Sequence, residues 1–219
     1  AGGGSWYIES LTTQLAEAAW AEFQKIEATG GINQAQAHID TALTEARAAF
    51  DAAIDSRAMP LVGVSEFPNL EEAPLATGGD NGYRLSAAYE ALRNAAQKAK
   101  PKVFLATIGE MASYTPRANF AANIFAAGGL HAVSGEGGTD AQAIAEAFKK
   151  STAKIAVICA GDEDYEAHAH EVAAALKAAG ATHIALAGKP RDNSDIDTYC
   201  FAGCATLSFL QDIHKKLGL

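Results

Sequence analysis

The sequence has little basic charge and no long apolar run. Its 219 residues include 17 lysines and arginines against 26 aspartates and glutamates, which gives a formal net charge of −9. A nucleic-acid-binding protein needs a basic face to displace counterions, so this balance argues against a nucleic-acid partner. No apolar run approaches the roughly 20 residues that cross a bilayer. The first residues lack the basic and apolar regions of a signal peptide. We therefore expect a cytoplasmic protein with neither a nucleic-acid nor a membrane partner.

Cysteine is scarce, and its spacing carries little chemistry. The three cysteines, Cys159, Cys200 and Cys204, form no Cys-x-x-Cys pair. Cys200 and Cys204 are separated by a helical spacing, so one interpretation is a metal site. The favoured interpretation is three small buried thiols in a reducing compartment, because free cysteine behaves mostly as a small apolar residue.

Signatures of nucleotide or covalent chemistry are also missing. The sequence contains no P-loop, no nucleophile elbow and no zinc-ligand spacing. His168 and His170 are two residues apart on a predicted helix, so they point in different directions. His131, His183 and His214 have no evident cysteine, serine or carboxylate partner in the sequence. We therefore expect no catalytic residue and no metal site in this chain.

The first 59 residues read as two helices without a core of their own. Residues 10–56 carry two stripes of apolar residues at intervals of three and four, the pattern of a helix with one buried face. Gly30 and Gly31 separate the stripes, because two adjacent glycines disfavour a continuing helix. Two amphipathic helices form only a thin core, so we interpret residues 1–59 as part of a larger domain or interface.

Residues 60–100 are predicted to be a linker followed by a linking helix. Between Pro60 and Gly82 the helical pattern gives way to prolines, glycines and acidic residues. The apolar residues among them favour a segment that wraps a surface over one that hangs free. A helix is then predicted from about Leu85 to Ala99.

Residues 101–219 alternate between strand and helix. The predicted strands are Val103–Ile108, Leu130–Ser134, Ile155–Cys159, His183–Ala187 and Tyr199–Phe201. The predicted helices lie near 117–127, 140–150, 163–179 and 205–217. Continuous apolar strands are typical of a sheet that is buried on both faces. Right-handed crossovers then predict an α/β, flavodoxin-like fold with a five-stranded parallel sheet in the order 2-1-3-4-5.

Ligands of such a sheet bind outside the carboxyl ends of the strands. The loops expected there are 109–116, 135–139, 160–164, 188–194 and 202–204. The glycine-rich loop at 135–139 suggests an anion cradle, but glycines before a helix more often permit a tight turn, with Thr139 or Asp140 as the helix cap. Three carboxylates at 162–164 suggest a magnesium or phospho-acceptor site, yet the dipole of a helix favours acidic residues at its start without any ligand.

Two segments resemble the methylmalonyl-CoA mutase family. The stretch from Gly3 to Thr12, continued from Ala18 to Ile32, is similar to the end of that family's substrate-binding (β/α)₈ barrel. Residues 101–219 resemble its carboxy-terminal cobalamin-binding domain, and Ser65–Pro68 in the linker also fits. The resemblance covers nearly the whole chain. It implies that residues 1–59 are the terminal helices of a truncated barrel domain.

The resemblance also implies a site that has lost its ligands. Cobalamin-binding members carry Asp-x-His-x-x-Gly after the first strand, and the histidine coordinates cobalt from below. This chain has Met111, Ser113 and Pro116 at those three positions. A hydroxyl is a poor cobalt donor compared with imidazole, and a proline fixes φ in what we expect to be a loop. The pocket positions after strands three and four are similarly altered around Gly161 and Gly188, so we expect the tunnel for the nucleotide tail of cobalamin to be filled or closed.

These departures are similar to those of the family's small, or beta, subunits. The resemblance implies a non-catalytic chain that binds no cofactor and pairs with a large (alpha) subunit. The large subunit would hold adenosylcobalamin and interconvert methylmalonyl-CoA and succinyl-CoA. One alternative is a domain that binds cobalamin base-on, without a histidine ligand. Another is a receiver-like domain phosphorylated at Asp162, although the residues that end strand three do not favour it.

Overall fold

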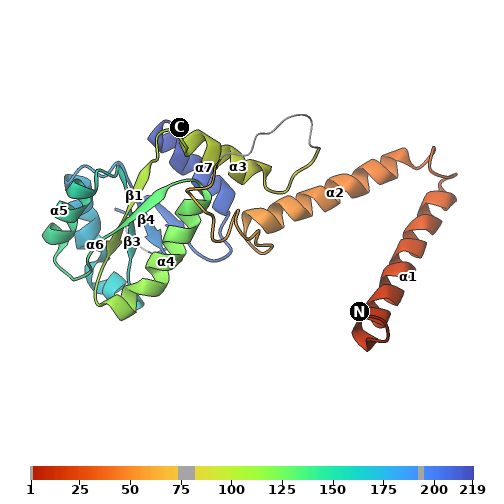
Figure 1. Ribbon diagram of the computed structural model, residues 1–219, viewed down its shortest axis with the longest axis horizontal. Helices are drawn as coiled ribbons and strands as arrows, with labels where there is room; N and C mark the ends of the chain where they lie inside the picture. Colours follow the sequence, from red (N-terminus) through yellow and green to blue (C-terminus); the bar gives the residue numbers. More distant parts are fainter. Residues whose placement is uncertain (1, 74–81, 192–194) are drawn as a thin grey trace. The chain divides into compact units, whose positions relative to one another are not determined.

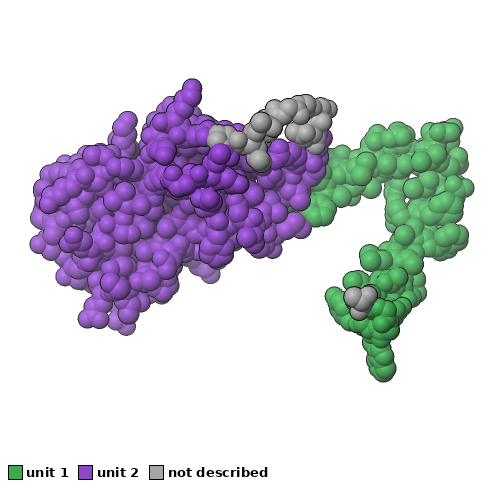
Figure 2. All heavy atoms as spheres, in the orientation of Figure 1, with its two compact units in different colours: residues 1–50 green, residues 51–219 purple. Residues whose placement is uncertain are grey.

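The computed structural model describes residues 2–73, 82–191 and 195–219. The chain divides into two compact units, residues 1–50 and residues 51–219 (Figure 2). Part of the predicted linker, including Pro74 and Asp80, lies outside the described residues, as does the end of the predicted loop 188–194. None of the described helices is both long enough and apolar enough to span a membrane.

The first unit contains helix α1 (Trp6–Ala28) and most of α2 (Gln36–Asp55). The break predicted at Gly30 and Gly31 is confirmed, because these residues have φ values of +101° and +85°. The second helix begins later than the apolar stripe indicated, because residues 31–35 form turns closed by backbone hydrogen bonds to the Gly31 carbonyl. Glu22 of α1 and His38 of α2 contact each other at 2.5 Å.

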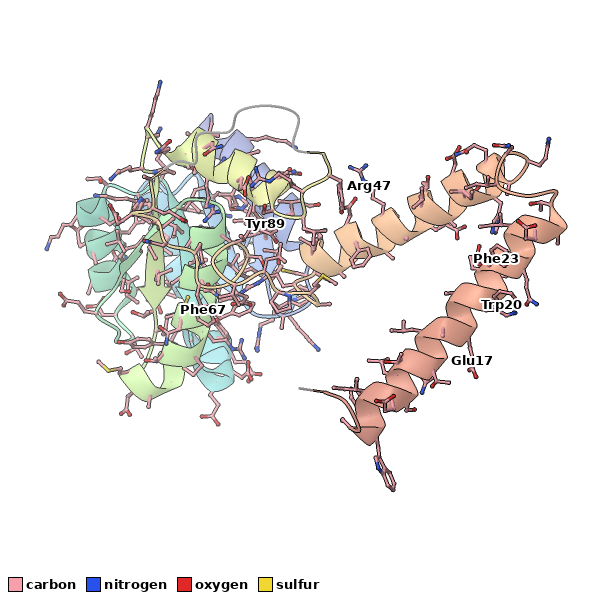
Figure 3. All side chains as sticks on the ribbon, turned by 45° about the vertical axis from the view of Figure 1, so that its right-hand side comes forward. Glu17, Trp20, Phe23, Arg47, Phe67 and Tyr89 are labelled. Carbon is pink, nitrogen blue, oxygen red and sulfur yellow. The ribbon has the colours of Figure 1, made fainter. Side chains whose placement is uncertain are left out.

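Helix α1 has no buried residue. Trp6 and Trp20 are 91% and 60% exposed, and Trp20 stacks on Phe23 with the ring centroids 5.2 Å apart (Figure 3). Apolar area left in water forgoes about 25 cal/mol per Å², so this helix contributes little to stability through packing.

The second unit is built on five parallel strands. They are β1 (Lys102–Thr107), β2 (His131–Ser134), β3 (Ile155–Cys159), β4 (His183–Ala187) and β5 (Thr198–Cys200). The sheet order is β2-β1-β3-β4-β5, which confirms the predicted flavodoxin-like topology. Strands β3 and β4 are buried along their whole length, as their continuous apolar sequences predicted.

Helices cover both faces of the sheet (Figure 1). They are α3 (Ala87–Ala96), α4 (Met111–Ala127), α5 (Ala141–Ser151), α6 (Asp162–Ala178) and α7 (Thr206–Leu217). Alternate strand residues point to opposite faces: Val103 and Leu105 pack with α3, α4 and α7, whereas Phe104 and Ala106 pack with α5 and α6. The carboxyl ends of the strands thus meet the first turns of α4 and α6.

The start of α4 differs from the prediction. The expected loop 109–116 is helical from Met111 onward, and Pro116 lies inside the helix. The backbone N–H groups of Ser113 and Tyr114 both donate to the Glu110 carbonyl and so close the first turn. Pro116 is the sixth residue of α4, beyond the first four N–H groups that have no partner within a helix, so its missing N–H costs the helix one hydrogen bond, to the Ala112 carbonyl. The prediction was wrong because it treated Pro116 as excluding a helix.

The start of the predicted linker wraps the second unit. Leu61 and Val64 pack against the core formed by α3, α4 and α7. Ser65 is fully buried, and its hydroxyl accepts a hydrogen bond from the Leu61 N–H at 2.9 Å. The Phe67 N–H donates to the Asn123 side chain at 2.7 Å, which ties the segment to α4.

Candidate functional site

The first part of the candidate site is a hydrogen bond across the carboxyl edge of the sheet. Ser113, in the first turn of α4, donates its hydroxyl proton to the Asp164 carboxylate of α6 at 2.7 Å. This bond joins the segments that follow β1 and β3, the neighbouring strands at which the chain reverses its direction of winding. Ser113 therefore has its partner within the chain and does not present a free donor above the sheet.

Met111 and Pro116 do not face Ser113's partner. Met111 is the first residue of α4 and is 72% exposed. Pro116 is exposed on the same helix, farther from the strand. The three positions predicted from the motif thus lie within the first two turns of one helix rather than around one loop. A thioether, a hydroxyl and a ring without an N–H do not supply the carboxylate–imidazole pair that holds cobalt.

Side chains of this chain lie close against the two glycines that were expected to line the pocket. A Cβ placed on Gly161 would lie 2.4 Å from the Ser113 hydroxyl oxygen, and a Cβ on Gly188 would lie 2.8 Å from the Arg117 guanidinium. Both glycines therefore allow side chains of this chain to lie close against the backbone. Ser113 thus lies against Gly161 and Arg117 against Gly188. These residues do not fit cobalamin bound through a protein ligand.

Sequence analysis missed a cluster of arginines around Tyr165. Arg117 of α4 donates to the Ala187 carbonyl at 2.9 Å and pairs with Asp162 at 3.2 Å. Arg191 also pairs with Asp162, and the two guanidinium groups lie 5.6 and 5.0 Å from the centre of the Tyr165 ring. One sequence signal was available, because Lys189-Pro-Arg191 follows β4 after a single glycine, at the ligand edge.

Tyr165 itself is a buried anchor for this cluster. Its hydroxyl lies 2.7 Å from the Ala187 carbonyl and 3.2 Å from the Ile158 carbonyl, and it is the donor in both contacts. Burial, followed by the nearby Cys159, raises the pKa of the Tyr165 hydroxyl. The phenol therefore remains protonated and serves as a structural donor rather than a proton-transfer group.

The glycine-rich loop at 135–139 is a tight turn. Gly109 and Gly138 exchange backbone hydrogen bonds at 2.9 and 3.0 Å, and the Gly137 N–H donates to the Thr107 hydroxyl at 3.0 Å. The N–H groups that would cradle an anion are therefore already used. The predicted helix cap is confirmed as Asp140, whose carboxylate accepts from the N–H groups of the second and third residues of α5.

The acidic and histidine candidates do not form a metal centre. Among the described residues, no group of three His, Cys, Asp or Glu side chains is placed to hold a metal. His170 pairs with Asp195 at 3.1 Å, and His183 lies 2.8 Å from the Thr198 hydroxyl and 3.6 Å from Asp197. Burial lowers the pKa of His183. The carboxylate partner absent from the local sequence of His183 is thus supplied by the segment before β5.

All three cysteines are buried and unpaired. Cys200 ends β5 and Cys204 lies in the following loop, so the helical spacing considered for this pair was wrong. Burial raises the pKa of Cys159 well above its usual value and that of Cys200 to about 12. Both thiols are therefore protonated at neutral pH and are not nucleophiles, since the thiolate is the reactive form.

Known proteins of one family are similar to this chain. The family model of methylmalonyl-CoA mutase matches residues 1–150. The methylmalonyl-CoA mutase small subunit of Streptomyces virginiae is 41% identical over 236 residues, which cover 99% of this chain and 38% of that protein. The small subunit of Propionibacterium freudenreichii subsp. shermanii is 38% identical and is matched over 37% of its length. The large subunit from S. virginiae matches only 30% of this chain, at 41% identity.

The chain thus spans less than two fifths of the length of these small subunits. The match nevertheless includes both units of the structure, because it covers 99% of the chain. On this similarity, and on a family model that matches more than half of its residues, the chain belongs to the methylmalonyl-CoA mutase family.

Proposed function

We propose that this chain is a segment of the small subunit of a heterodimeric, adenosylcobalamin-dependent methylmalonyl-CoA mutase. The holoenzyme interconverts methylmalonyl-CoA and succinyl-CoA, and this chain contributes no catalytic group. Its role is to stabilise the large subunit, which binds the cofactor. The small-subunit names of its relatives support this assignment.

The single observation that carries the proposal is the pairing of Ser113 with Asp164. The residue at the position of the cobalt-ligating histidine is a serine, and its hydroxyl is committed to a carboxylate 2.7 Å away. Asp164 itself is half-buried, as is Ser113. Adenosylcobalamin would supply radical chemistry where it is bound. This chain offers no side-chain nitrogen at that position to hold it.

The exposed face of α1 supports the second part of the proposal, that residues 1–59 are the last helices of a barrel domain. Helix α1 carries Leu11, Leu15 and Phe23 with more than two fifths of each side chain exposed. Soluble proteins rarely leave a long apolar stripe uncovered. The small subunits matched here are more than twice as long as this chain, so they have additional residues that can cover it.

The proposal is tested by co-expression of the full-length chain with the large subunit from the same source. We expect the two to co-purify in equal amounts, with cobalamin present at one equivalent per pair. Mutase activity should require the large subunit and be absent from the full-length chain alone. Isomerisation of methylmalonyl-CoA by the full-length chain alone with adenosylcobalamin would contradict the proposal.

A further inference from the structure

A hollow of about 520 Å³ opens at the carboxyl ends of β4 and β5. We call it the β4–β5 hollow. Helix α4, the loop after β4 and the loop after β5 each contribute residues to it. Small-ligand sites typically have volumes of about 300–1,000 Å³. Its lining includes Pro116, Arg117, Phe120, Lys189, Arg191 and Phe201.

The hollow has an excess of positive charge. Arg117, Lys189 and Arg191 line it together with one carboxylate, Asp162. Three cations and one anion leave a formal charge of +2, in a chain whose net charge is −9. Lys189 is exposed, and within the described residues it takes part in no ion pair. This charge is unusual for the chain and favours an anionic ligand.

The two guanidinium groups are held in place before any ligand arrives. Arg117 donates to the Ala187 carbonyl at 2.9 Å, and both arginines lie over the buried Tyr165 ring and share Asp162. A planar guanidinium that is already oriented loses less entropy when it binds an oxyanion. One shared carboxylate does not neutralise two guanidinium groups, so donors remain for a ligand.

The remaining walls are apolar. Phe120 and Phe201 are half-buried, and Pro116 and Ala202 add further apolar surface to the lining. Burial of an apolar group against these side chains gains free energy in proportion to the area removed from water. An inorganic ion would leave this apolar surface exposed to water, whereas an anion with an apolar body would cover it.

We propose that the β4–β5 hollow binds a small organic anion: a carboxylate or phosphate head that meets Lys189 and Arg191, joined to an apolar body that packs on Phe120 and Phe201. The Ser113–Asp164 pair, beside β1 and β3, does not line this hollow, whereas Gly188, one of the two glycines considered for the tail pocket, does. The proposal does not depend on cobalamin or on the mutase reaction, so its test is independent of the test of the proposed function.

The test is a titration of the full-length chain with phenyl phosphate and with benzoate, by calorimetry and by the amide shifts of Gly188 and Lys189. We expect saturable binding of at least one of the two, with shifts at both amides. Inorganic phosphate and benzyl alcohol should each bind at least about tenfold more weakly, since each lacks one half of the recognised chemistry. The two organic anions together distinguish a phosphate site from a carboxylate site.

Variants locate the binding. Lys189→Ala and Arg191→Ala should each weaken the affinity by about tenfold, as expected for loss of a charged hydrogen-bond donor. Lys154→Ala, outside the hollow, is the matched control and should leave the affinity unchanged. Absence of saturable binding of both anions, equal binding of benzyl alcohol, or affinities that do not respond to the Lys189 and Arg191 variants would each overturn the proposal.

Discussion

At the scale of single residues, the Ser113–Asp164 pair is a structural contact between two helices. The hydroxyl links α4 to α6 across the sheet edge at 2.7 Å. Ser113→Ala should lower the free energy of unfolding by about 0.5–1.5 kcal/mol, because the carboxylate loses one donor. Urea denaturation of the full-length subunit measures this change in the free energy of unfolding. Asp164→Asn, which keeps an acceptor oxygen, should cost less; equal stability of Ser113→Ala and wild type would contradict the assignment.

Tyr89 makes stability depend on pH in the alkaline range. It is fully buried, and burial, followed by the nearby Asp55, raises the pKa of its hydroxyl to about 12 from 10.0. Below pH 10 both the folded and the unfolded states keep the proton. As the pH rises from 10 to 12, the unfolded state releases this proton first, so the free energy of unfolding falls by up to about 1.4 kcal/mol per pH unit.

Replacement by phenylalanine isolates this contribution. Tyr89→Phe should show a shallower loss of stability than wild type between pH 10 and 12, measured by urea denaturation at each pH. At neutral pH it should lose little, because the hydroxyl contacts the Ile54 carbonyl only at 3.4 Å. Identical slopes for the two proteins across this window would show that the Tyr89 proton is not involved.

The sequence predicted some site residues and not others for a physical reason. Met111, Ser113 and Pro116 follow β1 at fixed spacing, so a local pattern found them. The cluster of Arg117, Tyr165 and Arg191 is assembled from α4, α6 and the loop after β4, which are up to 74 residues apart in sequence (191 − 117). Contacts of this kind depend on the packed fold and leave no periodic signal.

At the scale of secondary-structure elements, strands were easier to predict than helix starts. β3 and β4 have the predicted bounds, because each apolar run starts after a polar residue, Lys154 or Thr182, and reaches a glycine, Gly161 or Gly188, within two residues of its end. The start of α4 was misplaced because the effect of a proline on a helix depends on its position in that helix. It disfavours a helix interior, yet it is tolerated here on the second turn.

Pro116→Ala therefore tests the strain in α4. Alanine restores an N–H that can donate to the Ala112 carbonyl, so the variant should be more stable by about 1–3 kcal/mol in urea denaturation. Pro116→Gly restores the same N–H with a poorer helix propensity and should gain about 1 kcal/mol less. A less stable Pro116→Ala protein would mean that the proline ring is needed for packing at this position.

At the scale of the whole molecule, the two units differ in how far their apolar side chains are buried. Residues 51–219 enclose a core on both faces of a parallel sheet. In residues 1–50, α1 buries none of its side chains. The proposed barrel origin of residues 1–59 predicts that the apolar stripe of α1 is covered in the full-length subunit.

Paired variants on α1 test that coverage. Leu15→Asp should be nearly neutral in the 219-residue chain, where Leu15 is 63% exposed. In the full-length subunit it should lower the free energy of unfolding by at least about 2 kcal/mol, because it buries a charge. Gln24→Asp is the matched control, since nine residues turn the helix by about two and a half revolutions and so place it opposite Leu15. Equal effects of the two variants in the full-length subunit would contradict the coverage.

The central claim is that this chain holds no corrin through a side-chain ligand. It is tested most directly by titrating the full-length subunit with hydroxocobalamin, following the visible spectrum and then the corrin retained after gel filtration. The account predicts an unshifted spectrum and no stoichiometric retention, because Ser113 is bound to Asp164, and because Ser113 and Arg117 lie against Gly161 and Gly188. A spectrum typical of nitrogen coordination, or one equivalent of retained corrin, would contradict it.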